Sequence, residues 1–227
     1  MAQRDYILRM FEEMSRAVAQ IVYHRELKDY QASHELIDEQ FKQTLGMGRN
    51  FVQSLPEETL LAMLTTLDLL NIEKCWLVAT LLKAEGELYE EEQDEDKSYY
   101  SYLKACNLFL EALYNQNQQK EFEKIAEIEL LWRKLESYEL PRRTRSMLFW
   151  YFEYTGRYNK AEDMLFDILE TESAGETECV EEVEGIRARG EAFYARLLGK
   201  SDEILEAGNF PRAEIAEGLT RLHQFSI

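Results

Sequence analysis

The chain has 227 residues, of which 45% are hydrophobic, 12% aromatic and 31% charged. A chain this rich in core-forming residues is not disordered, and it is long enough to bury a core without disulfides or metals, so a single domain is expected. The net charge of −18 repels phosphate groups, which argues against nucleic acid or an anionic membrane as a direct partner.

Turn-forming residues are scarce, with only ten glycines and three prolines, while good helix formers abound. This composition predicts an all-α protein with long helices. The cysteines Cys75, Cys106 and Cys179 are few, odd in number and far apart, which favours a reducing, cytoplasmic compartment. Charges interrupt residues 1–14, so no signal peptide is expected there, and the apolar run at 76–82 is far short of the roughly 20 residues that a membrane span needs.

The first predicted helix begins near Tyr6, where apolar residues start to recur three and four positions apart. The chain turns near Asp29, and a second helix should end at Gly46, because glycine favours the end of a helix. Ser54, followed three residues later by Glu57, forms a capping box that starts the next helical region, which runs to about Glu92.

Residues 85–96 contain eight acids and no base, so a solvated acidic connector is expected there. Two further helices follow, and the second must end before Pro141, which opens another helix. A second acidic connector is expected near 170–184. A helix through 192–198 and a short C-terminal unit, with a stop at Gly208 and a restart at Pro211, complete about ten helices in one domain over 1–227.

The stretch YTGRYNKAEDMLFDIL, residues 154–169, places Gly156, Tyr158 and Ala161 at a turn between two helices. Earlier turns repeat a large residue followed three positions later by a small or branched one: Tyr30 with Ser33, Ile72 with Cys75, and Phe122 with Ile125. Such recurrence predicts helix hairpins stacked side by side.

The glycine, the aromatic residue two positions on and the alanine three further on resemble the tetratricopeptide repeat. The other turns have Lys28, Leu70 and Lys120 in place of the glycine. The whole chain, through QRDYILRM, YELP, TGRYNKAE and LEAGNFPRAEIAEGL, is also similar to a family of small bacterial proteins with no assigned function. The resemblance therefore implies a tetratricopeptide-like helix-hairpin solenoid and brings no activity with it.

In tetratricopeptide proteins the first helix of each hairpin lines a concave groove, and its positions can be transferred to this chain. The residues so predicted to bind a partner are Asn107, Tyr114, Asn117, Arg143, Trp150 and Tyr154. The alternative is that Trp150 and Tyr154 belong to the core of a closed bundle. In the earliest hairpins the matching positions, Leu60, Leu64 and Leu67, are apolar, and we expect another element or a second subunit to cover them.

Candidate catalytic groups are few. Only His24, His34 and His223 could serve as bases at neutral pH, and none follows a Glu at the spacing of a di-iron ligand pair. We interpret them as packing or surface residues and expect no metal, no cofactor and no catalytic residue. The sequence also lacks a phosphate-binding loop and a nucleophile elbow, and each cysteine is expected to be a small buried apolar residue.

The basic cluster PRRTR places Arg142, Arg143 and Arg145 in the first turn of a helix, where the macrodipole disfavours cations. One interpretation is ion pairing with nearby acids such as Glu136 and Glu139. The other is recognition of a carboxylate or phosphate.

Together these features predict a non-enzymatic module, an adaptor or regulator, that binds a protein or peptide segment in a helical groove. A homodimer formed through an apolar helix face is compatible with the same pattern. The alternative is a sensor that binds a small ligand or a short signalling peptide inside the solenoid.

Overall fold

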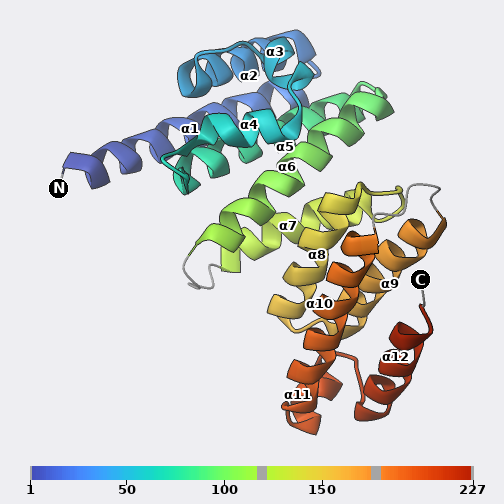
Figure 1. Cartoon of the computed structure of the whole chain (residues 1–227). Coiled ribbons are helices and arrows are strands. Elements are labelled where there is room, and N and C mark those ends of the chain that lie inside the picture. The colour runs from blue at the N-terminus through green and yellow to red at the C-terminus, as the bar shows by residue number, and fades with distance from the viewer. Residues whose placement is uncertain (1, 117–121, 175–179, 226–227) are drawn as a thin grey trace. The chain divides into compact units, whose positions relative to one another are not determined.

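The computed structural model describes residues 2–116, 122–174 and 180–225, and within these ranges the chain is all-α, as predicted (Figure 1). The described residues form twelve helices and one two-stranded hairpin. The elements are α1 (Ala2–Glu26), α2 (Tyr30–Leu45), α3 (Arg49–Ser54), α4 (Glu57–Leu64), β1 (Thr65–Thr66), β2 (Leu69–Leu70), α5 (Ile72–Glu91), α6 (Glu95–Asn115), α7 (Phe122–Leu135), α8 (Arg142–Thr155), α9 (Tyr158–Ala174), α10 (Val180–Leu198), α11 (Asp202–Ala207) and α12 (Arg212–Gln224). About ten helices were expected, and the six-residue α3 and α11 are too short to show helical periodicity in sequence.

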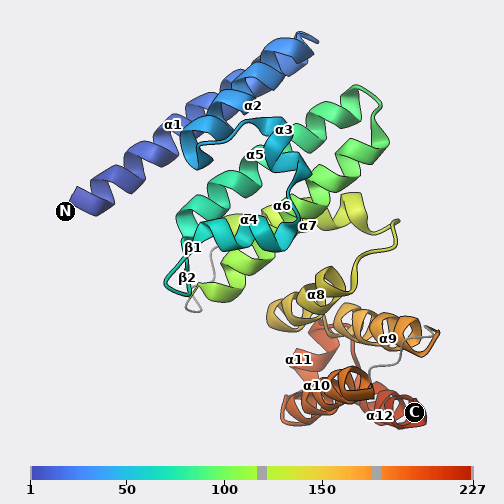
Figure 2. The same ribbon diagram turned by 45° about the horizontal axis from the view of Figure 1, so that its top comes forward.

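The chain divides into two compact units, one ending at Glu139 and the other beginning at Leu140. The boundary lies just before Pro141, whose φ of −57° sets the start of α8, as the sequence predicts. In the first unit, α1 and α2 lie side by side, and α5 and α6 pack along their length (Figure 2). In the second, α8 and α9 form a hairpin, while α10 contacts α9 and α12.

Four turns between consecutive helices share one hydrogen-bond pattern. In each turn a residue with left-handed backbone is followed by an amide that donates to a carbonyl five residues earlier, which is the Schellman ending of a helix. The left-handed residues are Lys28 (φ 58°), Gln93 (φ 63°), Gly156 (φ 80°) and Asn209 (φ 52°). The same turn therefore recurs although only one of the four positions holds glycine.

Small residues lie where the paired helices approach most closely. The Ser33 hydroxyl on α2 donates to the carbonyl of Ile21 on α1 at 3.2 Å. The Ser98 hydroxyl on α6 donates to the carbonyl of Gly86 on α5 at 3.0 Å. Ala161, five residues after its left-handed residue as both serines are, is fully buried on α9. The hairpins α1–α2, α5–α6 and α8–α9 thus each have a small buried residue five positions after the left-handed residue of the turn.

The acidic stretch 85–96 is mostly helical, which corrects the expected connector. Helix α5 runs to Glu91 and α6 begins at Glu95, so only residues 92–94 link them. The helix persists because its acids meet bases from other helices: Arg25 of α1 pairs with Glu87, and Lys134 of α7 pairs with Glu90 at 2.6 Å. Similarly, α9 extends to Ala174 and α10 begins at Val180, and the remainder of the second expected connector, 175–179, lies outside the described residues.

The core of the first unit is centred on α5 and α6. Cys75 and Cys106 are buried in it, as predicted, and burial raises the pKa of both thiols to about 12. Cys179 lies outside the described residues. Trp76 and Phe109 pack with ring centroids 4.6 Å apart. No helix within the described ranges has an apolar stretch long enough to span a bilayer.

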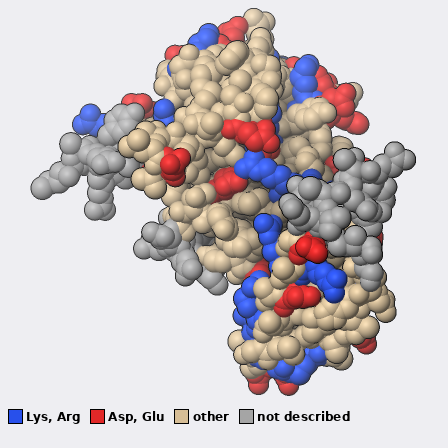
Figure 3. Space-filling view, viewed as in Figure 1, with Lys and Arg blue, Asp and Glu red and all other residues tan. Residues whose placement is uncertain are grey.

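The face in Figure 3 shows acidic and basic side chains next to one another in small groups, with uncharged surface between them. This distribution agrees with the many ion pairs between helices, such as Arg196 with Glu153 at 2.6 Å and Arg212 with Asp202 at 2.6 Å. Although the net charge is −18, that face does not carry one continuous acidic patch.

Candidate functional site

The first unit contains a buried carboxylate, Glu85 on α5, whose side chain has no exposed surface. Its Oε1 lies 3.4 Å from Nε of Arg49 on α3. Burial raises the pKa of Glu85 to about 7, against the opposing effects of Arg49, Gln53 and Lys104, which face it from α3 and α6. An acid whose protonation changes near neutral pH is typical of functional sites, although structural networks show it too.

His34 on α2 links this carboxylate to the surface. Its Nε2 lies 2.8 Å from Oε2 of Glu92, and its Nδ1 contacts the guanidinium of Arg49. A guanidinium can only donate, so Nδ1 accepts and the proton sits on Nε2, facing Glu92. The ring of His34 packs on Tyr89 with centroids 5.3 Å apart. The sequence interpretation of His34 as a packing or surface residue missed its place between Arg49 and Glu92.

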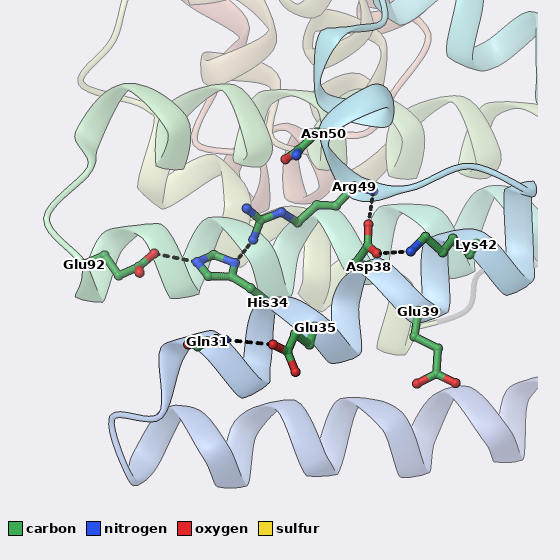
Figure 4. A pocket seen from close by; sticks show the side chains of 9 residues that line it. All are labelled: Gln31, His34, Glu35, Asp38, Glu39, Lys42, Arg49, Asn50 and Glu92. Carbon is green, nitrogen blue, oxygen red and sulfur yellow. Dashed lines mark hydrogen bonds and ion pairs between the residues drawn. The ribbon is translucent and has the colours of Figure 1, made fainter.

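His34, Arg49 and Glu92 line a pocket of about 660 Å³ that is open to solvent (Figure 4). It is lined by Gln31, His34, Glu35, Asp38, Glu39, Lys42, Arg49, Asn50 and Glu92. We call it the α2 pocket, because six of these residues lie on α2.

Asp38 fixes one wall of the α2 pocket. It accepts from the backbone amide of Arg49 at 2.7 Å and from Nζ of Lys42 at 2.6 Å. These two bonds, that from Lys42 foremost, lower the pKa of Asp38. Gly48 allows the approach, since a Cβ there would lie 2.8 Å from Oδ1 of Asp38. The start of α3 is therefore fastened to α2.

The other end of α3 is held from α5 and α6. Nζ of Lys104 donates to the carbonyls of Val52, at 3.3 Å, and Gln53, and the Gln53 amide donates to the Tyr89 hydroxyl at 3.0 Å. Burial lowers the pKa of Lys104 although Glu85 opposes the shift. The short helix that forms part of the α2 pocket is thus anchored at both ends by buried or half-buried polar groups.

The α2 pocket offers carboxylates, amides and one guanidinium, which are groups that bind polar ligands. Among the described residues, no three His, Cys, Asp or Glu side chains are grouped as a metal ion would need. Lys42 and Arg49 are engaged with Asp38 and Glu85, so both cations are fixed in place.

The residues predicted to bind a partner lie in different surroundings. Asn107 is only 3% exposed, and its amide donates to Glu57 rather than facing solvent, whereas Tyr114, also in the first unit, is 57% exposed. Asn117 lies outside the described residues. The other three are half-buried on α8 of the second unit: Arg143, Trp150 and Tyr154.

On α8 the rings of Trp150 and Tyr154 stack, with centroids 5.2 Å apart and an interplanar angle of 17°.

The first unit itself covers Leu60 and Leu64, which are buried, but Leu67 is 91% exposed at the tip of the β1–β2 hairpin.

Arg145 of the basic cluster has partners other than those expected from sequence. Its Nη1 donates to the carbonyl of Asp167 at 3.0 Å and to Oγ1 of Thr171 at 2.7 Å, both on α9. The side chain is 7% exposed. Arg145 therefore joins α8 to α9.

Comparison with known proteins adds a family and no activity. No curated protein and no solved structure matches the chain. A family model does match, over residues 1–226, and it is described as a family of unknown function, DUF6483. With nearly the whole chain covered by this match, the protein belongs to that family.

Proposed function

We propose that the chain is a non-enzymatic, cytoplasmic interaction module that binds a protein or peptide segment, and that the α2 pocket takes part of that segment. The observation that carries the proposal is the shape of the pocket lining. Gln31, Glu35, Asp38 and Lys42 follow one face of α2 over three turns. The eleven steps of helical rise from Gln31 to Lys42 cover about 16 Å, the length of roughly five residues of extended chain.

The chemistry of the lining supports a polypeptide ligand. Glu35 and Glu39 offer carboxylates, and Gln31 and Asn50 offer amides that can both donate to and accept from a peptide backbone. The Gln31 amide already donates to Glu35 at 3.0 Å across one turn of the helix, so both side chains point to the same side (Figure 4).

The tetratricopeptide-like organisation suggested by the sequence is supported by the recurrence of one turn and one small-residue contact in several hairpins. The open side of the α2 pocket favours a bound segment over the alternative of a sensor with an enclosed ligand cavity.

A homodimer remains part of the proposal, with Leu67 and Leu69, 91% and 74% exposed, as apolar groups that a second copy could cover.

Site-specific crosslinking tests the proposal. A photoreactive amino acid replaces Gln31 or Asn50 in the pocket, or exposed Glu58 on α4 as the control, in the native cell. We expect both pocket positions to capture the same peptide of one protein, identified by mass spectrometry, and Glu58 to capture none of it. Adducts that do not differ between the pocket and Glu58 would reject the α2 pocket as the binding site.

A charge reversal provides the complementary measurement once that segment is known. Glu35→Lys with Glu39→Lys should weaken its binding at least about tenfold, because two carboxylates of the lining are lost. Glu58→Lys changes one acid of similar exposure away from the pocket and should leave the affinity unchanged.

A further inference from the structure

A second pocket of the first unit, of about 600 Å³, lies where α5 turns into α6 and where α7 ends. Its lining combines tyrosines with acids: Glu90, Gln93, Glu95, Ser98, Tyr99, Tyr102, Lys134 and Tyr138. None of these residues belongs to the α2 pocket, and we call this one the tyrosine pocket. Tyrosine rings beside carboxylates are the surroundings in which proteins hold ammonium and guanidinium groups.

One side of the tyrosine pocket already holds a cation of the protein itself. Nζ of Lys134 lies 2.6 and 2.8 Å from the two oxygens of Glu90, and 5.9 Å from the ring centroid of Tyr102. The Tyr102 hydroxyl donates to the same carboxylate at 2.6 Å. Burial would raise the pKa of Glu90, but the hydrogen bonds from Lys134 and Tyr102 outweigh it and lower the pKa.

The position of Tyr102 depends on a glycine in the facing helix. A Cβ on Gly86 would lie 2.6 Å from the Tyr102 ring, so only glycine leaves room for the ring there. Ser98, next to it in the lining, is fixed by its bond to the Gly86 carbonyl. This side of the pocket is therefore rigidly built rather than formed by surface chains alone.

The other side of the pocket also has tyrosine rings and a carboxylate, but no lysine or arginine of the lining lies there. The rings of Tyr99 and Tyr138 lie 4.7 Å apart at 33°, and the Tyr99 hydroxyl donates to the carbonyl of Glu139 at 3.3 Å. Tyr138 is 45% exposed. In the part of the chain that the structure describes, Glu95 has no basic partner.

We infer that the tyrosine pocket binds a lysine or arginine side chain of the partner segment, held against Tyr99 and Tyr138 and paired with Glu95. The inference rests on the proposed function, because it names a side chain of the bound segment. The charge of the molecule agrees with it: a net charge of −18 attracts a basic segment and repels an acidic one.

The test uses defined probes on the full chain with ¹³C-labelled tyrosine rings, observed by NMR. n-Butylammonium and the pentapeptide acetyl-Gly-Gly-Lys-Gly-Gly-amide carry the cation. n-Butanol and the same peptide with glutamine do not. We expect saturable shifts of the Tyr99 and Tyr138 resonances with both cations and none with the neutral probes. Equal shifts with neutral and cationic probes, or no shift with the lysine peptide, would overturn the inference.

Variants separate the pocket from general surface binding. Glu95→Gln and Tyr138→Leu should each weaken cation binding about fivefold or more, while Tyr23→Leu should not change it. Tyr23 is the control because it is 59% exposed, lies on α1 and is absent from this lining. Equal losses in all three variants, with unchanged thermal melting, would also overturn the inference.

A variant that should bind the cation more tightly is also informative, because misfolding could explain a loss of binding but not a gain. Lys134→Met removes the built-in cation and leaves Glu90 and Tyr102 open to the probe, so n-butylammonium should bind about fivefold tighter. Affinity that stays the same or falls contradicts the inference. A chain that captures one segment through Gln31 and Asn50 but shows no cation-selective tyrosine shifts would keep the proposed function and lose only this pocket.

Discussion

Arg49 and Glu85 face each other inside the first unit, with Nε of the guanidinium 3.4 Å from Oε1 of a carboxylate that has no exposed surface. An ordinary charge-assisted hydrogen bond joins such atoms at about 2.7–2.9 Å, so this contact is long. Burial therefore dominates, and it raises the pKa of Glu85 to about 7 where a close ion pair would lower it. The charge at the centre of this unit consequently changes near neutral pH.

Glu85 should make the protein less stable as the pH rises from about 4.5 to about 7. The folded-state pKa of about 7 exceeds the ordinary value of 4.5, so the native state binds more protons than the unfolded state in this window. The free energy of unfolding should fall across it by on the order of 3 kcal/mol and then level off. Urea denaturation at a series of pH values measures this contribution.

The matched variant Glu85→Gln isolates that contribution from other titrating groups. Its stability relative to the parent should rise as the pH increases, because only the parent must ionise a buried acid. Glu58→Gln, an exposed acid on α4, should give a curve parallel to that of the parent. Parallel curves for both variants would show that Glu85 ionises as freely in the folded chain as in the unfolded one.

The sequence predicted the fold best where a turn signal and a helical stripe coincide. Gly156, Tyr158 and Ala161 mark the α8–α9 turn correctly, and Pro141 marks the start of α8. It failed at 85–96, because counting acids ignores bases that arrive from distant helices. A signal was present there: Ser98 follows Gln93 by five residues, as Ala161 follows Gly156.

The candidate site could not be predicted in the same way. His34 meets Arg49 from 15 residues away and Glu92 from 58 residues away, and no local motif records such contacts. Glu85 looked like one solvated acid among eight, yet its position on α5 turns it toward Arg49 and Lys104. Which acid of a charged run is buried depends on how the helices pack.

Gly86→Ala should destabilise the protein by about 1–3 kcal/mol, because the added Cβ would lie 2.6 Å from the Tyr102 ring and push it out of place. Thermal or urea unfolding measures the loss. Gly185→Ala on α10 is the control: nothing lies within 4 Å of the added Cβ, so alanine should stabilise the helix by roughly 0.5–1 kcal/mol. Changes of the same sign in both variants would contradict the close packing at Gly86.

The β1–β2 hairpin carries a turn that its sequence does not suit. Leu67 and Asp68 both have left-handed backbone, with φ of 52° and 60°, between the paired residues Thr66 and Leu69. A two-residue turn of this kind prefers Asn-Gly, and a bulky residue such as leucine is strained in it. Leu67→Asn with Asp68→Gly should therefore stabilise the chain by about 1–2 kcal/mol.

The same double variant tests the proposed homodimer. If a second copy covers Leu67, sedimentation should show weaker self-association although the monomer fold is more stable. Leu198→Asn, which removes a leucine of 53% exposure from the end of α10, controls for the loss of an exposed apolar side chain. Self-association that is unchanged in the hairpin variant would exclude Leu67 from the contact.

Arg145 offers the clearest test of how the second unit is held together. A cation in the first turn of α8 opposes the helix macrodipole, so it must be stabilised by other contacts. Its bonds to the Asp167 carbonyl and to Thr171 on α9 provide them. Arg145→Met keeps the apolar stem but loses both bonds, and it should lower the free energy of unfolding by about 2–4 kcal/mol.

Arg145→Lys should recover only part of this loss, because one ammonium does not reproduce the fork of a guanidinium. Arg189→Met, which removes an exposed arginine of α10, should change stability by less than about 0.5 kcal/mol. Urea denaturation measures these changes. If Arg145→Met lowered the free energy of unfolding as little as Arg189→Met does, the two bonds would only offset the macrodipole penalty, and packing alone would hold α8 to α9.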